Sequence, residues 1–251
     1  MPARRSVSTR LHMETEYINL GDGVNGAACP AGMDRLVWCP GDYDFDPLKV
    51  MYKGDFSTVI KAKCLVSGTA VVLKMYAKEK LHPVCLRQIE REIAIHSQLS
   101  HPNIVSLYGA FEDRKFYYLV MEYANGGDLF EEIHSRGGNM SEKDTVNIVA
   151  LPLLRALAYL HDQGFIHRDI KPENILFDAG MTLKLADFGF VVDQNEERPV
   201  TRAGTTQYMA PEIIHNPLKT MPSDNKDNKN LVYGEKVDIW SAAVTIYEAL
   251  H

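Results

Sequence analysis

The stretch that decides the fold is His167-Arg168-Asp169-Ile170-Lys171-Pro172-Glu173-Asn174. It holds a carboxylate, an ammonium group and an amide within six residues, at Asp169, Lys171 and Asn174. Pro172 fixes its own backbone φ angle and therefore favours a defined turn between them. Side chains of these types can orient a hydroxyl, neutralise a phosphate and ligate a metal ion, so the stretch predicts a catalytic loop.

Two further motifs follow this loop in the sequence. Asp187-Phe188-Gly189 begins 13 residues after Asn174, and Ala210-Pro211-Glu212 comes later. In order and spacing, the three motifs resemble the HRDxxxxN, DFG and APE set of the protein kinases. The probability that all three occur in this order by chance is negligible. The chain therefore resembles the eukaryotic protein kinase family from about residue 44 to residue 251.

This resemblance implies a two-lobed α+β fold. A small lobe over residues 44–124 would hold an antiparallel sheet and one helix, and a larger, mainly helical lobe would occupy residues 125–251. It also implies that the last helices of the family's large lobe are absent from the sequence. We expect this absence to expose Ile239, Val244 and Ile246 to water and to make the isolated chain prone to aggregation.

Length and composition agree with one two-lobed domain or two small ones. The chain has 251 residues, of which 45% are hydrophobic and 24% charged, and this excludes a wholly disordered protein. The net charge of −6 argues against nucleic acid as a main ligand. The longest apolar run, residues 148–160, is shorter than the roughly 20 residues that a membrane span needs. Four scattered cysteines do not form a disulfide framework.

Residues 1–43 show no sustained helical or strand periodicity and are interrupted by glycine and proline. We interpret them as a disordered, flexible tail. The basic, serine-rich start is similar to an organelle transit peptide, but Glu14, Glu16 and Asp22 follow soon after it. Organelle targeting by residues 1–15 is therefore less favoured, and we expect a cytoplasmic or nuclear protein.

Strand patterns come first in the remaining chain. Short β-branched runs at 58–62 and 70–75 predict two antiparallel strands, and the runs at 105–111 and 116–123 predict a second hairpin. Apolar residues at helical spacing predict an amphipathic helix between Pro83 and Leu99.

Helical patterns dominate the later part of the chain, most clearly over residues 141–163. Ser141 suits the start of that helix and Gly164 its end. Pro152 lacks an amide donor, so it predicts either a kink or a helix held tightly by packing. The polar segment 216–230 is expected to be a solvated surface loop, with partner binding as the less favoured alternative.

The family resemblance assigns four catalytic side chains. Lys74 would contact the α- and β-phosphates of ATP, and Glu92 on the amphipathic helix would hold that lysine in place. Asp169 would accept a proton from the substrate hydroxyl or orient it, and Lys171 would neutralise the γ-phosphate.

The resemblance also implies ATP and Mg²⁺ as cofactors. Asn174 and Asp187 would ligate Mg²⁺ because they offer hard oxygen donors. Tyr52 and Ser57 stand where the family's phosphate loop has glycines, so weaker nucleotide binding or reduced loop mobility is expected. The residues assigned to ATP binding are Met51, Tyr52, Lys53, Gly54, Phe56, Ser57, Val59, Val72, Lys74, Met121, Glu122, Ala124, Asp128 and Leu176.

Two threonines complete the assigned site. Thr201 matches the activation-loop phosphosite, where an upstream kinase or autophosphorylation would add a phosphate opposite Arg168; Thr206 is the competing site. Thr205 matches the threonine that bonds the catalytic loop in Ser/Thr kinases, and Lys171 is also typical of that class. The buried histidine predicted at His167 would pack against the Phe188 ring.

These residues lead to two hypotheses. The first is an ATP-dependent protein serine/threonine kinase, a signalling phosphotransferase whose partners are protein substrates bearing Ser or Thr. The alternative is a non-catalytic, nucleotide-binding scaffold similar to a pseudokinase, which the altered phosphate loop and the missing helices favour.

Overall fold

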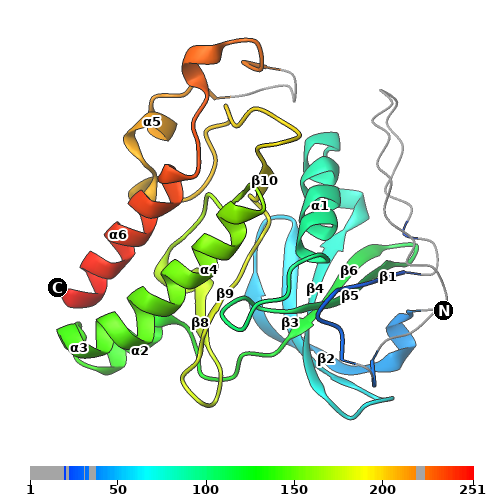
Figure 1. The fold of residues 1–251 in the computed structure, drawn as a ribbon. Helices are drawn as coiled ribbons and strands as arrows, with labels where there is room; N and C mark the ends of the chain where they lie inside the picture. Colours follow the sequence, from blue (N-terminus) through cyan, green and yellow to red (C-terminus); the bar gives the residue numbers. More distant parts are fainter. Residues whose placement is uncertain (1–19, 21–22, 31, 34–37, 219–223) are drawn as a thin grey trace.

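The computed structural model describes residues 20, 23–30, 32–33, 38–218 and 224–251. A sheet lobe and a helical lobe lie side by side, and the chain passes from the first to the second after residue 122 (Figure 1). This arrangement confirms the two-lobed α+β fold. Among the described residues, we find no helix with the length and apolar character that crossing a membrane requires.

The small lobe is built on one antiparallel sheet with the strand order β1-β5-β6-β4-β3-β2. Its register places Val59 opposite Lys74, and Val72 opposite Met121, so predicted site residues meet across neighbouring strands. The strands are β1 (Val24–Asn25), β2 (Tyr43–Lys53), β3 (Ser57–Cys64), β4 (Ala70–Ala77), β5 (Leu107–Glu112) and β6 (Phe116–Glu122).

Helix α1 (Pro83–His96) covers one face of this sheet. Its apolar residues Ile89 and Ile93 pack with Tyr76, Leu107 and Leu119 from the strands, as the predicted amphipathic pattern requires. Residues of alternate strand positions form a second cluster on the opposite face, because successive side chains of a strand point to opposite sides.

The predicted tail is wrong where residues 23–43 are described, because part of it belongs to the small lobe. Strand β1 pairs with the edge strand β5, with Val24 opposite Ala110. The amide of Gly26 donates to the carbonyl of Tyr108 at 3.0 Å, and the amide of Ala27 donates to Ser97 at 2.7 Å. The segment thus adds a strand to the sheet and contacts the chain that leaves α1.

The same segment covers the sheet face opposite α1. Met33 and Trp38 are buried there with residues of the strands. Trp38 lies directly over Gly109, where a Cβ atom would come within 2.5 Å of the indole ring. A two-residue strand and a glycine that accepts a tryptophan leave no periodic signal, which explains the wrong prediction. The transit-peptide alternative for residues 1–15 falls outside the described residues.

The large lobe is mainly helical. It contains α2 (Leu129–Ser135), α3 (Glu142–Asp144), a π-helical turn (Thr145–Ala150), α4 (Leu151–Asp162), α5 (Pro211–Ile214) and α6 (Lys236–Leu250). Short strands pair as β7 (Phe165–Ile166) with β10 (Val192–Asp193), and β8 (Ile175–Phe177) with β9 (Leu183–Leu185). Single 3-10 turns lie at Pro172–Asn174, Thr206–Tyr208 and Lys229–Leu231 in this lobe, and at Pro40–Asp42 and Lys78–Lys80 in the small lobe.

The structure accommodates Pro152 through the π-helical turn before it. The amide of Leu151 reaches the carbonyl of Val146, five residues back, so the helix widens where the proline cannot donate. Ser141 caps the start by accepting from the amide of Asp144, and Gly164 has a positive φ of 82° at the end. The chain is therefore helical from Glu142 to Asp162 as predicted, with a π-helical turn just before Pro152.

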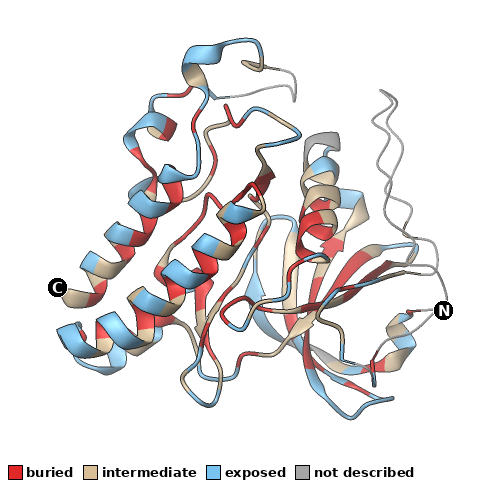
Figure 2. Cartoon of the chain, viewed as in Figure 1, coloured by how far each residue is buried: buried red, intermediate tan, exposed pale blue. Residues whose placement is uncertain are grey.

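Buried residues concentrate along the middle of both lobes (Figure 2). In the large lobe, α4 contributes Leu153, Leu157 and Leu160, and α6 contributes Ala242 and Ala249. The outer face of α6 carries its exposed apolar side chains, Ile239, Trp240 and Tyr247. Of the three residues predicted to be exposed, Ile239 is, whereas Val244 and Ile246 are only partly so.

Candidate active site

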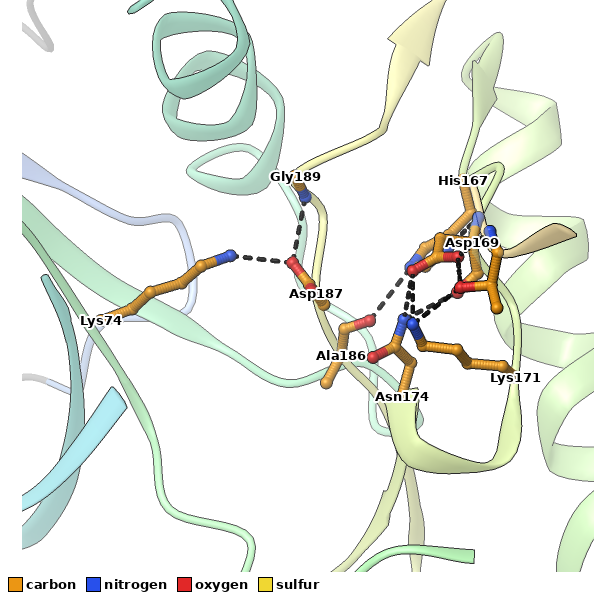
Figure 3. A network of polar contacts seen from close by, with 9 residues as sticks. Lys74, His167, Asp169, Lys171, Asn174, Ala186, Asp187 and Gly189 are labelled. Carbon is orange, nitrogen blue, oxygen red and sulfur yellow. Dashed lines mark hydrogen bonds and ion pairs between the residues drawn. The ribbon is translucent and has the colours of Figure 1, made fainter. Parts of the chain in front are cut away.

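Three predicted residues meet between the lobes. The Lys74 ammonium of β4 lies 2.8 Å from the Glu92 carboxylate of α1. It lies equally close, at 2.8 Å, to the Asp187 carboxylate that follows β9, and Asp187 also accepts from the amide of Gly189 (Figure 3). Residues that are 18 and 113 positions apart in sequence are thus joined through one ammonium group.

These charges set the protonation of the cluster. Burial would lower the pKa of Lys74, but the carboxylates of Asp187 and Glu92 outweigh it and raise this pKa well above its ordinary value. For Asp187, burial would raise the pKa, whereas the Lys74 ammonium and the Gly189 amide lower it to about 2. Both groups are therefore charged at neutral pH, as binding of a phosphate and of a metal ion requires.

Tyr76 belongs to this cluster, although we did not predict it. Its hydroxyl donates to Oε2 of Glu92 at 2.6 Å, while Lys74 binds Oε1 of the same carboxylate. Burial and the neighbouring Glu92 raise the pKa of Tyr76 well above its ordinary value, so the phenol remains a donor. A signal existed in the sequence, because residues two apart on a strand share a face.

The catalytic loop brings together the second group of predicted residues. Thr205 donates to Oδ1 of Asp169 through both its amide, at 2.8 Å, and its hydroxyl, at 2.7 Å. Lys171 lies 3.1 Å from Oδ2 of Asp169 and 2.8 Å from the Thr205 hydroxyl. Asn174 donates to Oδ2 of Asp169 at 3.0 Å as well, so three side chains converge on this carboxylate, and Figure 3 shows Lys171 and Asn174 beside it.

Asp238 of α6 anchors the backbone of this loop. Its two carboxylate oxygens accept from the backbone amides of His167 and Arg168, each at 2.8 Å. Arg168 adopts a positive φ of 72°, a conformation that a non-glycine residue adopts only when its surroundings hold it. The fully buried Asp238 therefore fixes the loop's strained backbone.

Aromatic packing around Phe188 also supports the loop. The ring of His167 meets the ring of Phe188 edge-on at 5.0 Å, as predicted. His96 of α1 packs on the same phenylalanine at 4.4 Å and contacts the carbonyl of Val105 at 2.7 Å. Phe188 thus connects α1 with the catalytic loop through two histidine rings.

Most of the predicted nucleotide-binding residues lie on β2, β3, β4 and β6. Val72 and Ala124 are buried, whereas Met51, Tyr52 and Phe56 are exposed where β2 turns into β3. At that turn, the Gly54 amide donates to the carbonyl of Ser57 at 2.9 Å. The exposed aromatic rings replace the open backbone that a glycine-rich loop would offer.

Glu122 and Asp128, two further residues assigned to nucleotide binding, also make contacts within the protein. Glu122 uses its carboxylate to bind Lys184, at 2.7 Å, and the amide of Ser106. Asp128 caps α2 by accepting from the amide of Glu131 at 2.8 Å, and a bridge joins its backbone to Leu176. These contacts fix the segment that connects the lobes.

The donor set fits Mg²⁺ bound together with phosphate. Asn174 uses its amide N–H groups on Asp169, which leaves its amide oxygen as a donor, and Asp187 offers a charged carboxylate. Within the described ranges, no cluster of three or more His, Cys, Asp or Glu side chains could hold a metal. Two protein oxygens are suited to an ion that fills its shell with water and phosphate.

Thr201, the predicted phosphosite, is linked to Arg168 through Tyr233. Arg168 donates to the Tyr233 hydroxyl at 2.9 Å and to the carbonyl of Phe190 at 2.6 Å. Tyr233 in turn donates to the backbone carbonyl of Thr201 at 2.6 Å. One tyrosine therefore separates the predicted phosphosite from the guanidinium group.

Comparison with known proteins agrees with this geometry. The protein kinase domain family matches residues 45–251. An Aurora kinase of Encephalitozoon cuniculi is 36% identical over 207 residues, which cover 82% of this chain and 71% of that protein. The serine/threonine-protein kinase Aurora-2 of Arabidopsis thaliana is 38% identical over 226 residues, covering 90% of this chain and 73% of that protein.

Other relatives are longer than the matched region. An Aurora kinase of Patiria pectinifera is 38% identical over 208 residues, covering 82% of this chain, and the match spans only 48% of that protein. The chain thus spans from about half to about three quarters of the length of these relatives. By the extent of the domain match and by these relatives, the chain belongs to the eukaryotic serine/threonine protein kinase family.

Proposed function

We propose that this chain transfers the γ-phosphate of ATP to serine or threonine hydroxyls of protein substrates. The observation that carries the proposal is the convergence of Lys171, Asn174 and Thr205 on Asp169, next to a cluster in which the Lys74 ammonium contacts the carboxylates of both Glu92 and Asp187. Phosphoryl transfer depends mainly on positioning and charge stabilisation, and these two clusters supply both.

In the proposed reaction, the substrate hydroxyl oxygen forms a bond to the γ-phosphorus. The bond between that phosphorus and the β–γ bridging oxygen breaks, and ADP leaves with the bonding pair. Asp169 orients the hydroxyl and takes its proton, while Lys171, which lies 3.1 Å from Asp169, stabilises the charge on the transferred phosphate. Lys74, held by Glu92, contacts the α- and β-phosphates.

Asn174 and Asp187 would hold Mg²⁺. The bound ion supplies neutralisation of phosphate charge. Because the pKa of Asp187 is about 2, its carboxylate is ionised and available to a cation throughout the neutral range. Its present partner, the Lys74 ammonium at 2.8 Å, would share it with that ion.

Transfer of labelled γ-phosphate to a generic Ser/Thr protein tests this proposal. We expect incorporation of label with Mg²⁺, loss of incorporation when the metal is chelated, and loss in Asp187→Ala. Label that enters the substrate equally well without divalent metal would contradict the assigned site.

A second candidate is a nucleotide-binding scaffold without catalysis, favoured by the exposed Tyr52 and Phe56 side chains in place of an open phosphate loop. A thermal-shift titration separates the two, because a ligand that binds only the folded state stabilises it by RT ln(1 + [L]/Kd). A clear, Mg²⁺-dependent shift by ATP together with no phosphate transfer would favour the scaffold.

We further propose that phosphorylation at Thr201 raises activity. A phosphate adds about −1.5 to −2 charge near Arg168 and Tyr233, the two side chains that link Thr201 to the catalytic loop. If phosphorylated wild type and Thr201→Ala transfer phosphate at equal rates, the phosphosite is wrong and Thr206 is tested next.

A further inference from the structure

A carboxylate that the proposed reaction does not use joins three segments of the chain. Glu197 lies in the activation segment, residues 187–212. Its Oε1 is 2.6 Å from Nη2 of Arg91 on α1, and its Oε2 is 3.2 Å from Nζ of Lys226. Glu197 therefore links the activation segment both to the helix of the small lobe and to the loop at residues 224–230.

The Arg91–Glu197 contact lies next to the cluster of Lys74, Glu92 and Asp187. Arg91 immediately precedes Glu92, the residue that holds Lys74. Consecutive residues on an α-helix point about 100° apart, so Arg91 can face the activation segment while Glu92 faces Lys74. An anchor on Arg91 therefore limits both the rotation of α1 and its distance from the large lobe, and with them the position of Glu92.

Arg91 is partly buried near other positive charges, so a carboxylate beside it stabilises its charged form. Burial lowers the pKa of Arg91, and the positive charges of Arg168 and Arg87 lower it further, while Glu197 and Tyr233 oppose them. Arg168 bonds only to neutral oxygens, those of Phe190 and Tyr233, in its described contacts. Glu197 supplies the carboxylate that pairs with Arg91, at 2.6 Å.

The loop on the other side of Glu197 is bound to the same segment. Asn216 donates to the carbonyls of Val200, at 3.3 Å, and Leu231, at 2.9 Å. The amide of Tyr233 donates to the carbonyl of Pro199 at 3.1 Å. The chain at either end of the polar segment thus contacts the activation segment, while residues 227–230 are exposed as expected.

We propose that Glu197 is a positioning residue, a permanent anion that ties the activation segment to α1 and keeps Glu92 on Lys74 without phosphorylation. The inference rests on the proposed phosphotransferase function and adds which contact holds Glu92 in its position on Lys74. Its geometric basis is the pair of contacts to Arg91 and Lys226, at 2.6 and 3.2 Å, in a partly buried position.

The test compares Glu197→Gln with Glu196→Gln in a Thr201→Ala background, so that no phosphate at Thr201 contributes. Glu196 is the exposed neighbour and serves as the matched control. Because a hydrogen bond between charged groups is strong, we expect kcat/KM for ATP to fall about tenfold or more in Glu197→Gln. Glu196→Gln should match its background.

A charge exchange gives the specific control. Arg91→Glu alone should lose activity, and the double variant Arg91→Glu, Glu197→Arg should recover part of it, because the pair is restored with reversed polarity while Lys226 then faces a like charge. The proposal is overturned if Glu197→Gln behaves like Glu196→Gln, or if the double variant is no better than either single one.

Hydrogen exchange supplies a readout that does not need activity. The amides of residues 89–93 should exchange faster in Glu197→Gln than in Glu196→Gln, because α1 loses its anchor. If exchange is faster in Glu197→Gln but the parent protein transfers no phosphate, the positioning role of Glu197 stands. The proposed phosphotransferase function is then rejected. If the parent protein transfers phosphate but the amides exchange equally fast in Glu197→Gln and Glu196→Gln, the positioning role of Glu197 is rejected. This holds even if the double variant fails to fold.

Discussion

The hydroxyl of Tyr76 donates to one oxygen of the Glu92 carboxylate at 2.6 Å while Lys74 binds the other at 2.8 Å. Tyr76 and Lys74 lie on the same face of β4, and α1 brings Glu92 to both. The carboxylate is therefore fixed at both oxygens before any nucleotide is bound. This arrangement predicts that Tyr76 determines how well Lys74 is placed.

Tyr76→Phe should lower kcat/KM for ATP about tenfold, because the lost hydrogen bond to a charged group contributes about 1.5–3 kcal/mol. Tyr118→Phe is a matched control, since that hydroxyl donates to Asp113 at 2.9 Å on the other side of the sheet. Steady-state kinetics at varied ATP measures both variants. Equal losses in the two would show that the effect comes from the sheet and not from Glu92.

The packing of the N-terminal segment predicts a difference between the chain's two tryptophans. Trp38 is 4% exposed and Trp240 is 47% exposed. Trp38→Ala should reduce the free energy of unfolding by about 3–5 kcal/mol, the usual cost of removing a buried aromatic side chain. Trp240→Ala should reduce it by about 1 kcal/mol or less.

Urea unfolding followed by circular dichroism measures both variants without relying on tryptophan fluorescence. A loss for Trp38→Ala no larger than that for Trp240→Ala would mean that the segment at residues 23–43 contributes little to the stability of the small lobe.

His96 predicts a pH dependence of stability. Burial lowers its pKa to about 4, despite the contact with the carbonyl of Val105, whereas an unfolded histidine has a pKa near 6.5. The unfolded state therefore binds the proton more tightly between these two pH values. The contribution is fully present above about pH 6.5 and is lost as the pH falls toward 4, by about 3 kcal/mol in total.

The measurement is the free energy of unfolding from pH 7 to pH 4.5 for wild type, His96→Asn and the exposed control His134→Asn. We expect a flatter pH dependence for His96→Asn alone. Parallel curves for wild type and His96→Asn would show that His96 is not held neutral in the folded protein.

The sequence predicted those parts of the site that lie close together in the chain. The loop at residues 167–174 and the Asp187-Phe188-Gly189 motif carry their chemistry in adjacent residues, so their contacts could be anticipated. The partners that the fold brings from a distance were partly missed. Tyr76 and the Glu197–Arg91 pair, at 2.6 Å, become visible only once α1 lies against the sheet and the activation segment.

The errors in the fold have a similar origin. Strand β1 has two residues and no alternating pattern, and it is held by backbone bonds and by Trp38 over Gly109. The π-helical turn at Thr145–Ala150 depends on how the chain adapts to Pro152, which periodicity does not specify. Long periodic segments such as α1 were predicted correctly because their apolar face must be buried in any compact arrangement.

The most direct test of the central claim is the rate of Mg²⁺–ATP-dependent phosphorylation of a Ser/Thr substrate by wild type and by Asp169→Asn. Asparagine keeps the size of the side chain but cannot take the hydroxyl proton, so we expect the rate at saturating ATP to fall about 100- to 10,000-fold. ATP affinity, measured by thermal shift, should change little. Equal rates in the two proteins would contradict the mechanism, and no transfer by a wild type that binds Mg²⁺–ATP would contradict the assignment of a kinase.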